Sequence, residues 1–377
     1  MNKLVKIDSS KIARNSSIEL LKIFGLILIV LCHSVPDYGN KELISYTDFS
    51  IATNNISEFI LMIFKNLGQV GNIIFITCSA YFLIDSKKVK IKKILYIMSD
   101  CFIISIIYVI IHLLFYFDKI PAKEMIKQCF PTTFGMNWFI QCYLILYIIH
   151  PYLNYVIRSL KKENLLRINI FFIMVYCIIT WILGGEKFYY NKLIGFIIIY
   201  FIMAYVKIYL PNFKKNKEIN KKLLLLGISG FFGVLIITDI LGLNIKFFSN
   251  KMLHWNNILN PFSILIGITL FNLCSSKYFE NTFINYISSV SLLFYVIHEN
   301  GLFRFYTKPL FYQYVFNFGN RLAWVLLEGI ILLIYGIIMS IIYKNTLQKI
   351  VYKVTDKFFY ISCNIWNHIE KILLKLN

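Results

Sequence analysis

The stretch that decides the fold is IELLKIFGLILIVLCHSV, residues 18–35, an apolar run with Lys22 near its beginning and His33 near its end. In a helix, a step of eleven residues returns to within about 20° of the same face and rises about 16 Å. The two side chains are therefore predicted to line one stripe of a membrane helix, about half a bilayer apart. A charged side chain inside such a helix is costly, which makes Lys22 a functional candidate by default.

The composition extends this prediction to the whole chain. Of 377 residues 58% are hydrophobic and only 15% are charged, and the mean hydropathy is +0.66. The apolar residues come in runs long enough to cross a bilayer, which predicts an all-α, polytopic membrane protein. The net charge of +20 lies in short clusters between the runs, as the positive-inside rule expects, and does not indicate nucleic-acid binding. Eight scattered cysteines without CxxC or CxxH spacing indicate neither disulfides nor a metal site.

About ten apolar runs have the length of membrane spans: 18–35, 58–84, 94–117, 134–157, 168–183, 191–210, 223–243, 258–274, 283–300 and 322–343. Ten spans place both termini in the cytoplasm together with every large lysine cluster. We predict a cytoplasmic N-terminus (1–17), a ten-helix transmembrane domain (18–343) and a cytoplasmic tail (344–377). The first span can serve as an uncleaved signal anchor. The tail interleaves apolar residues with lysines, which predicts an amphipathic helix on the inner leaflet.

Two of the six histidines stand out. His33 and His298 come about equally far along outward-running spans, so both are predicted in the outer half of the bilayer, and Glu299 follows His298 directly. A histidine paired with a carboxylate has the fixed tautomer and raised basicity that a general base needs. The alternative is two unrelated polar packing sites. The remaining histidines are interpreted as loop, tail or packed core residues: His112, His150, His254 and His368.

Other chemical signals are weak. The chain has no GxSxG elbow, P-loop, GxGxxG or HExxH motif. Asp100 and Asp239 lie within or near the third and seventh spans and are either relay groups or partners in helix–helix hydrogen bonds.

Four stretches carry a family resemblance. The first, NSSIELLKIFGLILIVLCHS (15–34), resembles the opening helix of the membrane-bound acyltransferase family 3, which is marked by a basic residue, ten residues and a histidine. Three others resemble later family segments in the same order: LGQVGNIIFITCSAYFL (67–83), NWFIQCYLILYIIHPYLN (137–154) and ISSVSLLFYVIHENGLFR (287–304). There are departures. Lys22 replaces the usual arginine and loses its bidentate fork, Ile76 replaces a phenylalanine, and Ala80 replaces a glycine.

The resemblance, over residues 14–304, implies a ten-helix enzyme of the bacterial cytoplasmic membrane. It would transfer an acyl group, commonly acetyl, from cytoplasmic acetyl-CoA to a hydroxyl of a surface polysaccharide, its lipid-linked precursor or peptidoglycan. His33 would be the base, with His298 and Glu299 as orienting groups, and no metal is expected. The resemblance also implies contact with membrane lipids, and it implies no nucleic-acid partner. Acetyl-CoA would contact Arg14, Lys22, Ser79, Tyr81, Lys87 and Lys88. The acceptor would contact Trp138, Gln141, Asn300 and Arg304.

Three alternatives stay open. A transporter or flippase of a lipid-linked glycan would use the same histidines and lysines to hold pyrophosphate, but the sequence predicts neither an internal repeat nor a pair of interrupted helices. The second alternative is a family member that no longer catalyses transfer, since Lys22 and Ala80 depart from the family pattern. A glycan polymerase is the third, although the chain lacks a long external loop.

Overall fold

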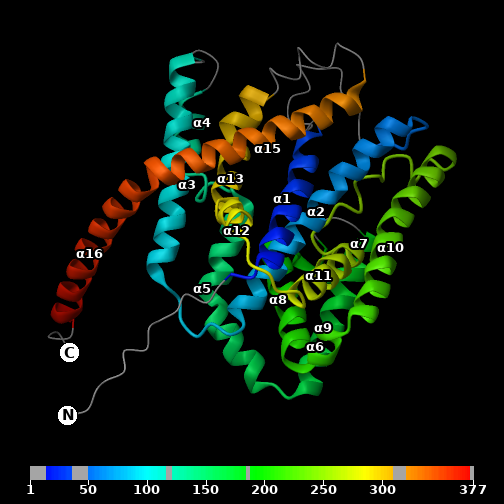
Figure 1. Cartoon of the computed structure of the whole chain (residues 1–377), viewed down its shortest axis with the longest axis horizontal. Helices are drawn as coiled ribbons and strands as arrows, with labels where there is room; N and C mark the ends of the chain where they lie inside the picture. The colour runs from blue at the N-terminus through cyan, green and yellow to red at the C-terminus, as the bar shows by residue number, and fades with distance from the viewer. Residues whose placement is uncertain (1–13, 36–49, 116–120, 184–186, 309–319, 374–377) are drawn as a thin grey trace.

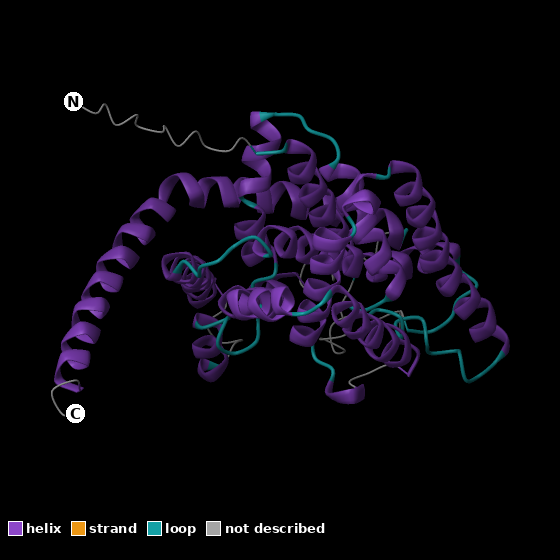
Figure 2. Ribbon diagram, turned by 90° about the horizontal axis from the view of Figure 1, so that it is seen from below, coloured by secondary structure: helices purple, strands orange, loops and turns teal. Residues whose placement is uncertain are grey.

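The computed structural model describes residues 14–35, 50–115, 121–183, 187–308 and 320–373, and all regular secondary structure in these ranges is helical (Figures 1 and 2). Eight helices are long and apolar enough to cross a membrane. They are α1 (Ser16–Ser34), α2 (Ile56–Leu83), α3 (Ile91–Phe115), α5 (Trp138–Ser159), Lys162–Leu183, α8 (Lys192–Tyr209), α10 (Lys217–Asn244) and α15 (Arg321–Thr346). The prediction of an all-helical polytopic protein is confirmed.

Two shorter apolar helices coincide with the predicted spans 258–274 and 283–300. They are α11 (Pro261–Ser275) and the segment Thr282–His298, which divides into α12 (Thr282–Ser289) and α13 (Ser291–His298) at Val290. The α11 helix begins where the Asn260 side chain accepts hydrogen bonds from the backbone N–H groups of Phe262 and Ser263. The number of segments that cross the membrane and the side of each terminus stay predictions.

The fifth predicted span is irregular. It consists of α6 (Lys162–Phe172), the π-helical η2 (Ile173–Ile179) and α7 (Thr180–Leu183). Four further short elements connect the long helices: α4 (Ala122–Cys129), η3 (Lys187–Tyr189), α9 (Pro211–Lys215) and η4 (Phe303–Thr307). The tail forms the helix α16 (Gln348–Leu373), which extends away from the bundle as an arm (Figure 2). Residues 1–13 of the predicted N-terminal segment lie outside the described ranges.

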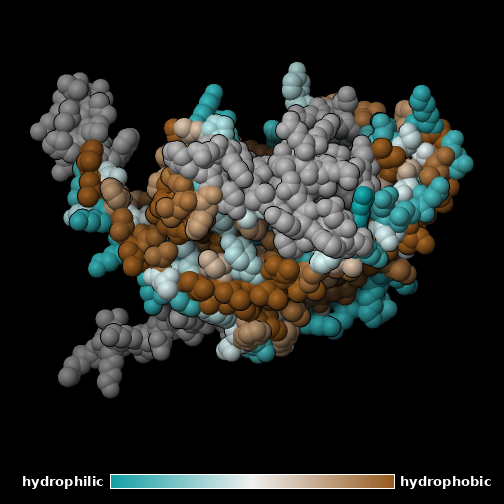
Figure 3. Space-filling model, turned by 90° about the horizontal axis from the view of Figure 1, so that it is seen from above, coloured by the Kyte–Doolittle hydropathy of each residue, from teal (hydrophilic) through white to brown (hydrophobic). Residues whose placement is uncertain are grey.

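The surface of the bundle is that of a membrane protein. Large apolar side chains such as Leu114 of α3, Leu225 of α10 and Ile334 of α15 are more than half exposed. Hydrophobic residues accordingly cover much of the visible face in Figure 3. Lipid is the surrounding that makes such exposure favourable.

Helix α1 packs against α2, α11, α12, α13 and α15. Its contact with α2 is close because glycines meet there. A Cβ atom on Gly71 would overlap the carbonyl oxygen of Gly25, and one on Gly68 would lie 2.7 Å from Sγ of Cys32. Small residues allow two membrane helices to approach until their backbones touch. This contact holds the stripe of α1 against the helices that complete the site.

Candidate active site

The predicted stripe of α1 lines a cavity. Lys22, Leu26 and Ile29 face a space of about 300 Å³ between α1, α2, α3, α5 and the α12–α13 segment. These positions follow helical spacing, and His33 comes one turn further on the same face. Helix α1 begins just before this stripe, where the Asn15 side chain accepts a hydrogen bond from the backbone N–H of Ser17. One helix face therefore runs from the cavity to the imidazole, as the spacing of residues predicts.

The cavity has a cationic end. The basic side chains of Arg14, Lys22 and Lys93 line it. Glu19 partly balances them, since its carboxylate lies 3.1 Å from Nζ of Lys22 and 3.5 Å from Nε of Arg14. Four serine side chains add hydroxyl groups to the lining: Ser79, Ser288, Ser289 and Ser291. The excess of positive charge suits an anionic ligand.

The other end of the cavity is apolar and aromatic. Phe75, Phe139 and Tyr295 line it together with Leu26 and Ile29 of α1. The ring centroids of Phe139 and Tyr295 are 5.8 Å apart, and that of Tyr295 is 5.9 Å from the imidazole of His298. The aromatic end of the cavity therefore borders on the histidines.

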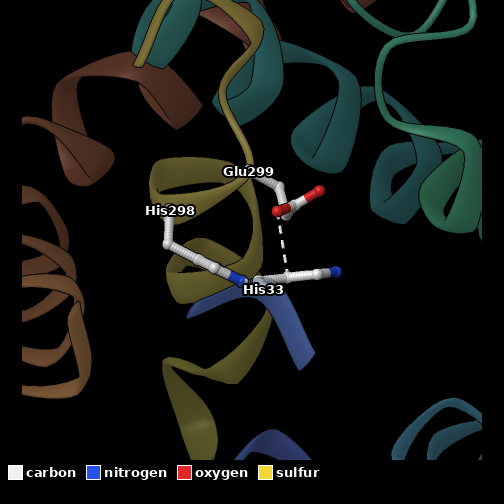
Figure 4. A group of neighbouring side chains, drawn as sticks. All are labelled: His33, His298 and Glu299. Carbon is white, nitrogen blue, oxygen red and sulfur yellow. Dashed lines mark hydrogen bonds and ion pairs between the residues drawn. The ribbon is translucent and has the colours of Figure 1, made fainter. Parts of the chain in front are cut away.

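His33, His298 and Glu299 meet at the C-terminal end of the stripe of α1 (Figure 4). Nδ1 of His33 lies 2.9 Å from Oε1 of Glu299 and 3.0 Å from Nε2 of His298. Nδ1 of His298 lies 2.8 Å from the carbonyl oxygen of Phe294 in the preceding turn of α13. The sequence prediction that both histidines reach the same depth agrees with this contact between their rings.

The hydrogen bonds of this cluster assign the tautomers. Because a carbonyl oxygen can only accept, the proton of a neutral His298 is on Nδ1, and its Nε2 carries a lone pair. Nδ1 of His33 therefore donates toward both Nε2 of His298 and the carboxylate of Glu299. Nε2 of a neutral His33 is left as a lone-pair acceptor. This arrangement is that of a histidine base oriented by a carboxylate.

Glu299 is buried, with a side chain only 6% exposed, and the guanidinium of Arg304 neutralises it. Its Oε2 atom lies 3.1 Å from a guanidinium nitrogen of Arg304. A buried carboxylate without such partners would be costly to ionise. The ion pair thus favours an ionised Glu299 beside His33.

The structure adds two residues beside His33 that the sequence prediction did not include, Lys308 and Glu328. Nζ of Lys308 donates a hydrogen bond to the backbone carbonyl oxygen of His33 and lies 3.2 Å from Oε1 of Glu328 on α15. Glu328 is buried, and the side chain of Lys308 is 11% exposed. The sequence signal for Glu328 was an acid within the apolar run 322–343, which is costly in a membrane unless it is paired. Lys308 thus links the end of α1 to the carboxylate of Glu328 on α15.

A metal ion has one candidate site in the described part of the chain. Nδ1 of His33, Nε2 of His298 and a carboxylate oxygen of Glu299 lie within 4.8 Å of one another. Their mutual hydrogen bonds already account for the cluster. Arg304 is also paired with Glu299, so that a dication would have to compete with it. We therefore keep the prediction of a site that works without a metal.

The residues predicted to hold the donor separate into two groups. Arg14, Lys22 and Ser79 line the cavity, together with Lys93, which the prediction missed although it belongs to the basic cluster 87–93. Nζ of Lys93 is 2.7 Å from the hydroxyl oxygen of Tyr143, another cavity residue.

The second group lies outside this lining. Lys87 and Lys88 lie before α3, in a stretch without regular secondary structure, and Lys88 is exposed. Tyr81 contacts Lys207 and Lys214 through its ring, with ammonium nitrogens 4.0 and 4.2 Å from the centroid. The donor contacts of this second group stay predictions.

The residues predicted to hold the acceptor have protein partners. Nζ of Lys192 lies 4.3 Å from the ring centroid of Trp138, and Gln141 donates to the backbone carbonyl oxygen of Thr132. Asn300 is 2% exposed and caps the following turn through Leu302. Arg304 pairs with Glu299 as described. Their contact with an acceptor stays a prediction.

The polar groups discounted or left open in the sequence have structural partners. His112 and His150 contact backbone carbonyl oxygens one turn earlier in their own helices. Asp100 accepts hydrogen bonds from Tyr343, Gln348 and Tyr352, which favours the interpretation as a helix–helix contact.

The fold and the site together define a polytopic membrane protein with a buried histidine–carboxylate centre beside a cationic cavity. The family model described as an acyltransferase domain matches residues 15–344, so the chain belongs to the acyltransferase 3 family and is a membrane acyltransferase. The resemblance stated for residues 14–304 is thereby confirmed. Neither the curated proteins nor the solved structures gave a match to the chain.

Proposed function

We propose that this acyltransferase moves an acetyl group from cytoplasmic acetyl-CoA to a hydroxyl of a surface polysaccharide or its lipid-linked precursor, in a bacterial cytoplasmic membrane. The observation that carries the proposal is the imidazole of His33, held by Glu299 on the same face of α1 as the cationic cavity. A base and an anion-binding cavity joined by one helix face suit a reaction whose two substrates arrive from opposite sides of the membrane.

The donor phosphates would bind at the cationic end. Arg14, Lys22 and Lys93 supply the charge there. The break at Val290 adds the N-terminus of the eight-residue helix α13, where Ser291 lines the cavity and no described side chain caps the helix. Uncapped N–H groups at a helix N-terminus favour phosphate oxygens.

The extended arm of the donor would follow the stripe. From Lys22 to His33 the rise of a helix is about 16 Å. Leu26 and Ile29 provide an apolar wall along this path, and the rings of Phe139 and Tyr295 line the end of the cavity that is next to the histidines.

The chemistry follows from the assigned tautomer. Nε2 of His33 takes the proton of the acceptor hydroxyl while its oxygen attacks the thioester carbonyl. The new C–O ester bond forms, the C–S bond breaks, and the imidazolium returns the proton to the leaving thiolate. Glu299 stabilises the imidazolium, and Arg304 keeps Glu299 ionised. His298 accepts from Nδ1 of His33 and so fixes its ring.

The test uses membranes that contain the His33→Ala variant. Loss of a general base costs about 10²–10⁴-fold in rate, so transfer of radiolabelled acetyl from acetyl-CoA to glycan should fall at least a hundredfold. His254→Ala, a loop histidine that contacts the carbonyl oxygen of Ile182, is the matched control and should transfer normally. Normal transfer by a His33→Ala protein present at the normal level would refute the proposal.

A flippase of a lipid-linked glycan is the second candidate, and one observation favours it. The run 283–300 is predicted as a continuous span, but the structure interrupts it at Val290, and no glycine or proline marks the break. Transporters use interrupted helices at their binding sites. If the protein is a flippase, deletion of the gene reduces the amount of surface glycan. If it is a transferase, deletion leaves the amount of glycan unchanged but the glycan lacks its ester groups. Mass spectrometry of the glycan distinguishes the two.

A further inference from the structure

A second cavity lies between α3 and the arm α16, away from the active site. It measures about 650 Å³, and apolar side chains dominate its lining. Leu95, Phe102 and Ile103 contribute from α3, and Val354 and Phe358 contribute from α16. The family match ends at residue 344, so the helix that forms one wall of this groove lies outside it.

Polar contacts hold α16 against α3 and keep the groove at a fixed width. Asp356 accepts a hydrogen bond from Tyr96 at 2.9 Å, and its carboxylate lies 2.7 Å from Nζ of Lys92. Thr355 donates to Ser99 at 2.9 Å, and the ring of Tyr352 stacks on that of Tyr96 with centroids 4.0 Å apart. The contacts along one side of α16 hold it against α3, and the groove lies between these two helices.

Two parallel rows of side chains run along α16, and the apolar one includes the groove residues Ile350, Val354 and Phe358. One row is apolar and exposed, with exposed fractions of 61% for Ile350, 49% for Val354 and 66% for Phe358. Ile361 and Ile365 continue it at helical spacing. In Figure 3 hydrophobic residues are visible along this arm at the edge of the molecule.

The other row is cationic. Lys349, Lys353 and Lys357 are all exposed, and their four-residue spacing places them on one face beside the apolar row. A helix with a lysine face next to an apolar face belongs at the boundary between headgroups and hydrocarbon. The structure thus fits the predicted amphipathic helix and adds a groove beneath it.

We propose that α3 and α16 form a binding site for an anionic phospholipid, with an acyl chain in the groove and the headgroup on Lys349, Lys353 and Lys357. The cationic row complements an anionic headgroup and gives no advantage to a zwitterionic one. The predicted topology places the start of α3 on the cytoplasmic side, so the lipid comes from the inner leaflet. A second copy of this chain is a poorer occupant, because a symmetric contact through α16 would bring lysine rows together.

The experiment is native mass spectrometry of the purified full-length protein in detergent. Phosphatidylglycerol and phosphatidylcholine with identical oleoyl chains are added in separate samples. We expect bound phosphatidylglycerol to exceed bound phosphatidylcholine at least fivefold. Replacement of Lys349, Lys353 and Lys357 by glutamine should remove that difference. The same replacement at Lys215, Lys217 and Lys222, exposed lysines of α9 and α10, is the matched control and should leave it intact.

Two further arms test the groove itself. Val354→Trp fills the groove and should lower binding of the oleoyl lipid at least threefold, whereas Ile365→Trp, outside the groove lining, should not. Dihexanoyl phosphatidylglycerol should bind at least threefold less than the oleoyl lipid. Equal binding of the two headgroups, or equal loss in the Lys215, Lys217 and Lys222 control, would overturn the proposal. A dimer that Val354→Trp dissociates would also overturn it, because the occupant would then be a second copy.

Discussion

The two ends of the α1 stripe look alike and differ in chemistry. At each end a basic side chain, 21% exposed, contacts a buried carboxylate: Lys22 with Glu19, 7% exposed, and His33 with Glu299, 6% exposed. Lysine carries its charge throughout any reaction near neutral pH, whereas imidazole gains and loses a proton in this range. The same geometry therefore gives a fixed charge at one end and a movable proton at the other. A fixed charge suits binding, and a movable proton suits catalysis.

Exchange of each carboxylate for its amide separates these two roles, and the largest effect is expected at Glu299. Glu299→Gln removes the charge that stabilises the imidazolium of His33, so kcat for acetyl transfer should fall about a hundredfold while KM for acetyl-CoA stays constant. Glu19→Gln is the matched control and should change kcat little. Steady-state kinetics in reconstituted vesicles provide the measurement, and a Glu299→Gln enzyme with normal kcat would contradict the assigned roles.

A smaller effect is expected at the other end of the stripe. Lys22→Ala removes a charged hydrogen-bond donor from the cavity, so KM for acetyl-CoA should rise about tenfold, with a smaller change in kcat. Lys22→Arg retains the charge and should keep KM within about twofold, since arginine binds phosphate at least as well as lysine. If Lys22→Ala lowered kcat alone, Lys22 would take part in the chemical step. The assignment of binding to the Lys22 end of the stripe and of catalysis to the His33 end would then be wrong.

The smallest effect concerns Lys93, which the structure adds to the cavity lining. Lys93→Gln should raise KM for acetyl-CoA about threefold, because one of three cations near the phosphates is lost. KM for S-acetyl-pantetheine, which has no nucleotide phosphates, should not change. Competition assays with both donors measure the two values. A parallel rise for both donors would show that Lys93 acts on the shape of the cavity rather than on phosphate.

Much of the stripe could be predicted from the sequence, because helical periodicity alone sets the relation between Lys22 and His33. Equal depth in two outward-running spans allows His298 to lie near His33, and the packing of α1 against α13 brings the two rings into contact. The family resemblance then supplied the reaction class that the residue pattern leaves open. These predictions rest on local helix geometry and on the bilayer, which gives the depth of a residue from its position along a span.

Other parts of the site depend on tertiary contacts that no local pattern contains. The helix break at Val290 has no glycine or proline to mark it. Lys93 differs from Lys87 and Lys88 only by its place in the first turn of α3, which turns it to the cavity. Lys308 and Glu328 meet beside His33 from segments distant in the sequence. For these residues the charge was visible in the sequence and the partner was not.

The helix α13 has a consequence for the order of events in the enzyme. It is only eight residues long, about 12 Å, and begins at the cavity with Ser291 and ends with His298, directly before Glu299. A rigid helix of this length that is displaced along its axis at one end is displaced equally at the other. If the donor pulls on Ser291, the same displacement reaches the partners of His33. The short helix would thus couple donor binding in the cavity to the position of the partners of His33.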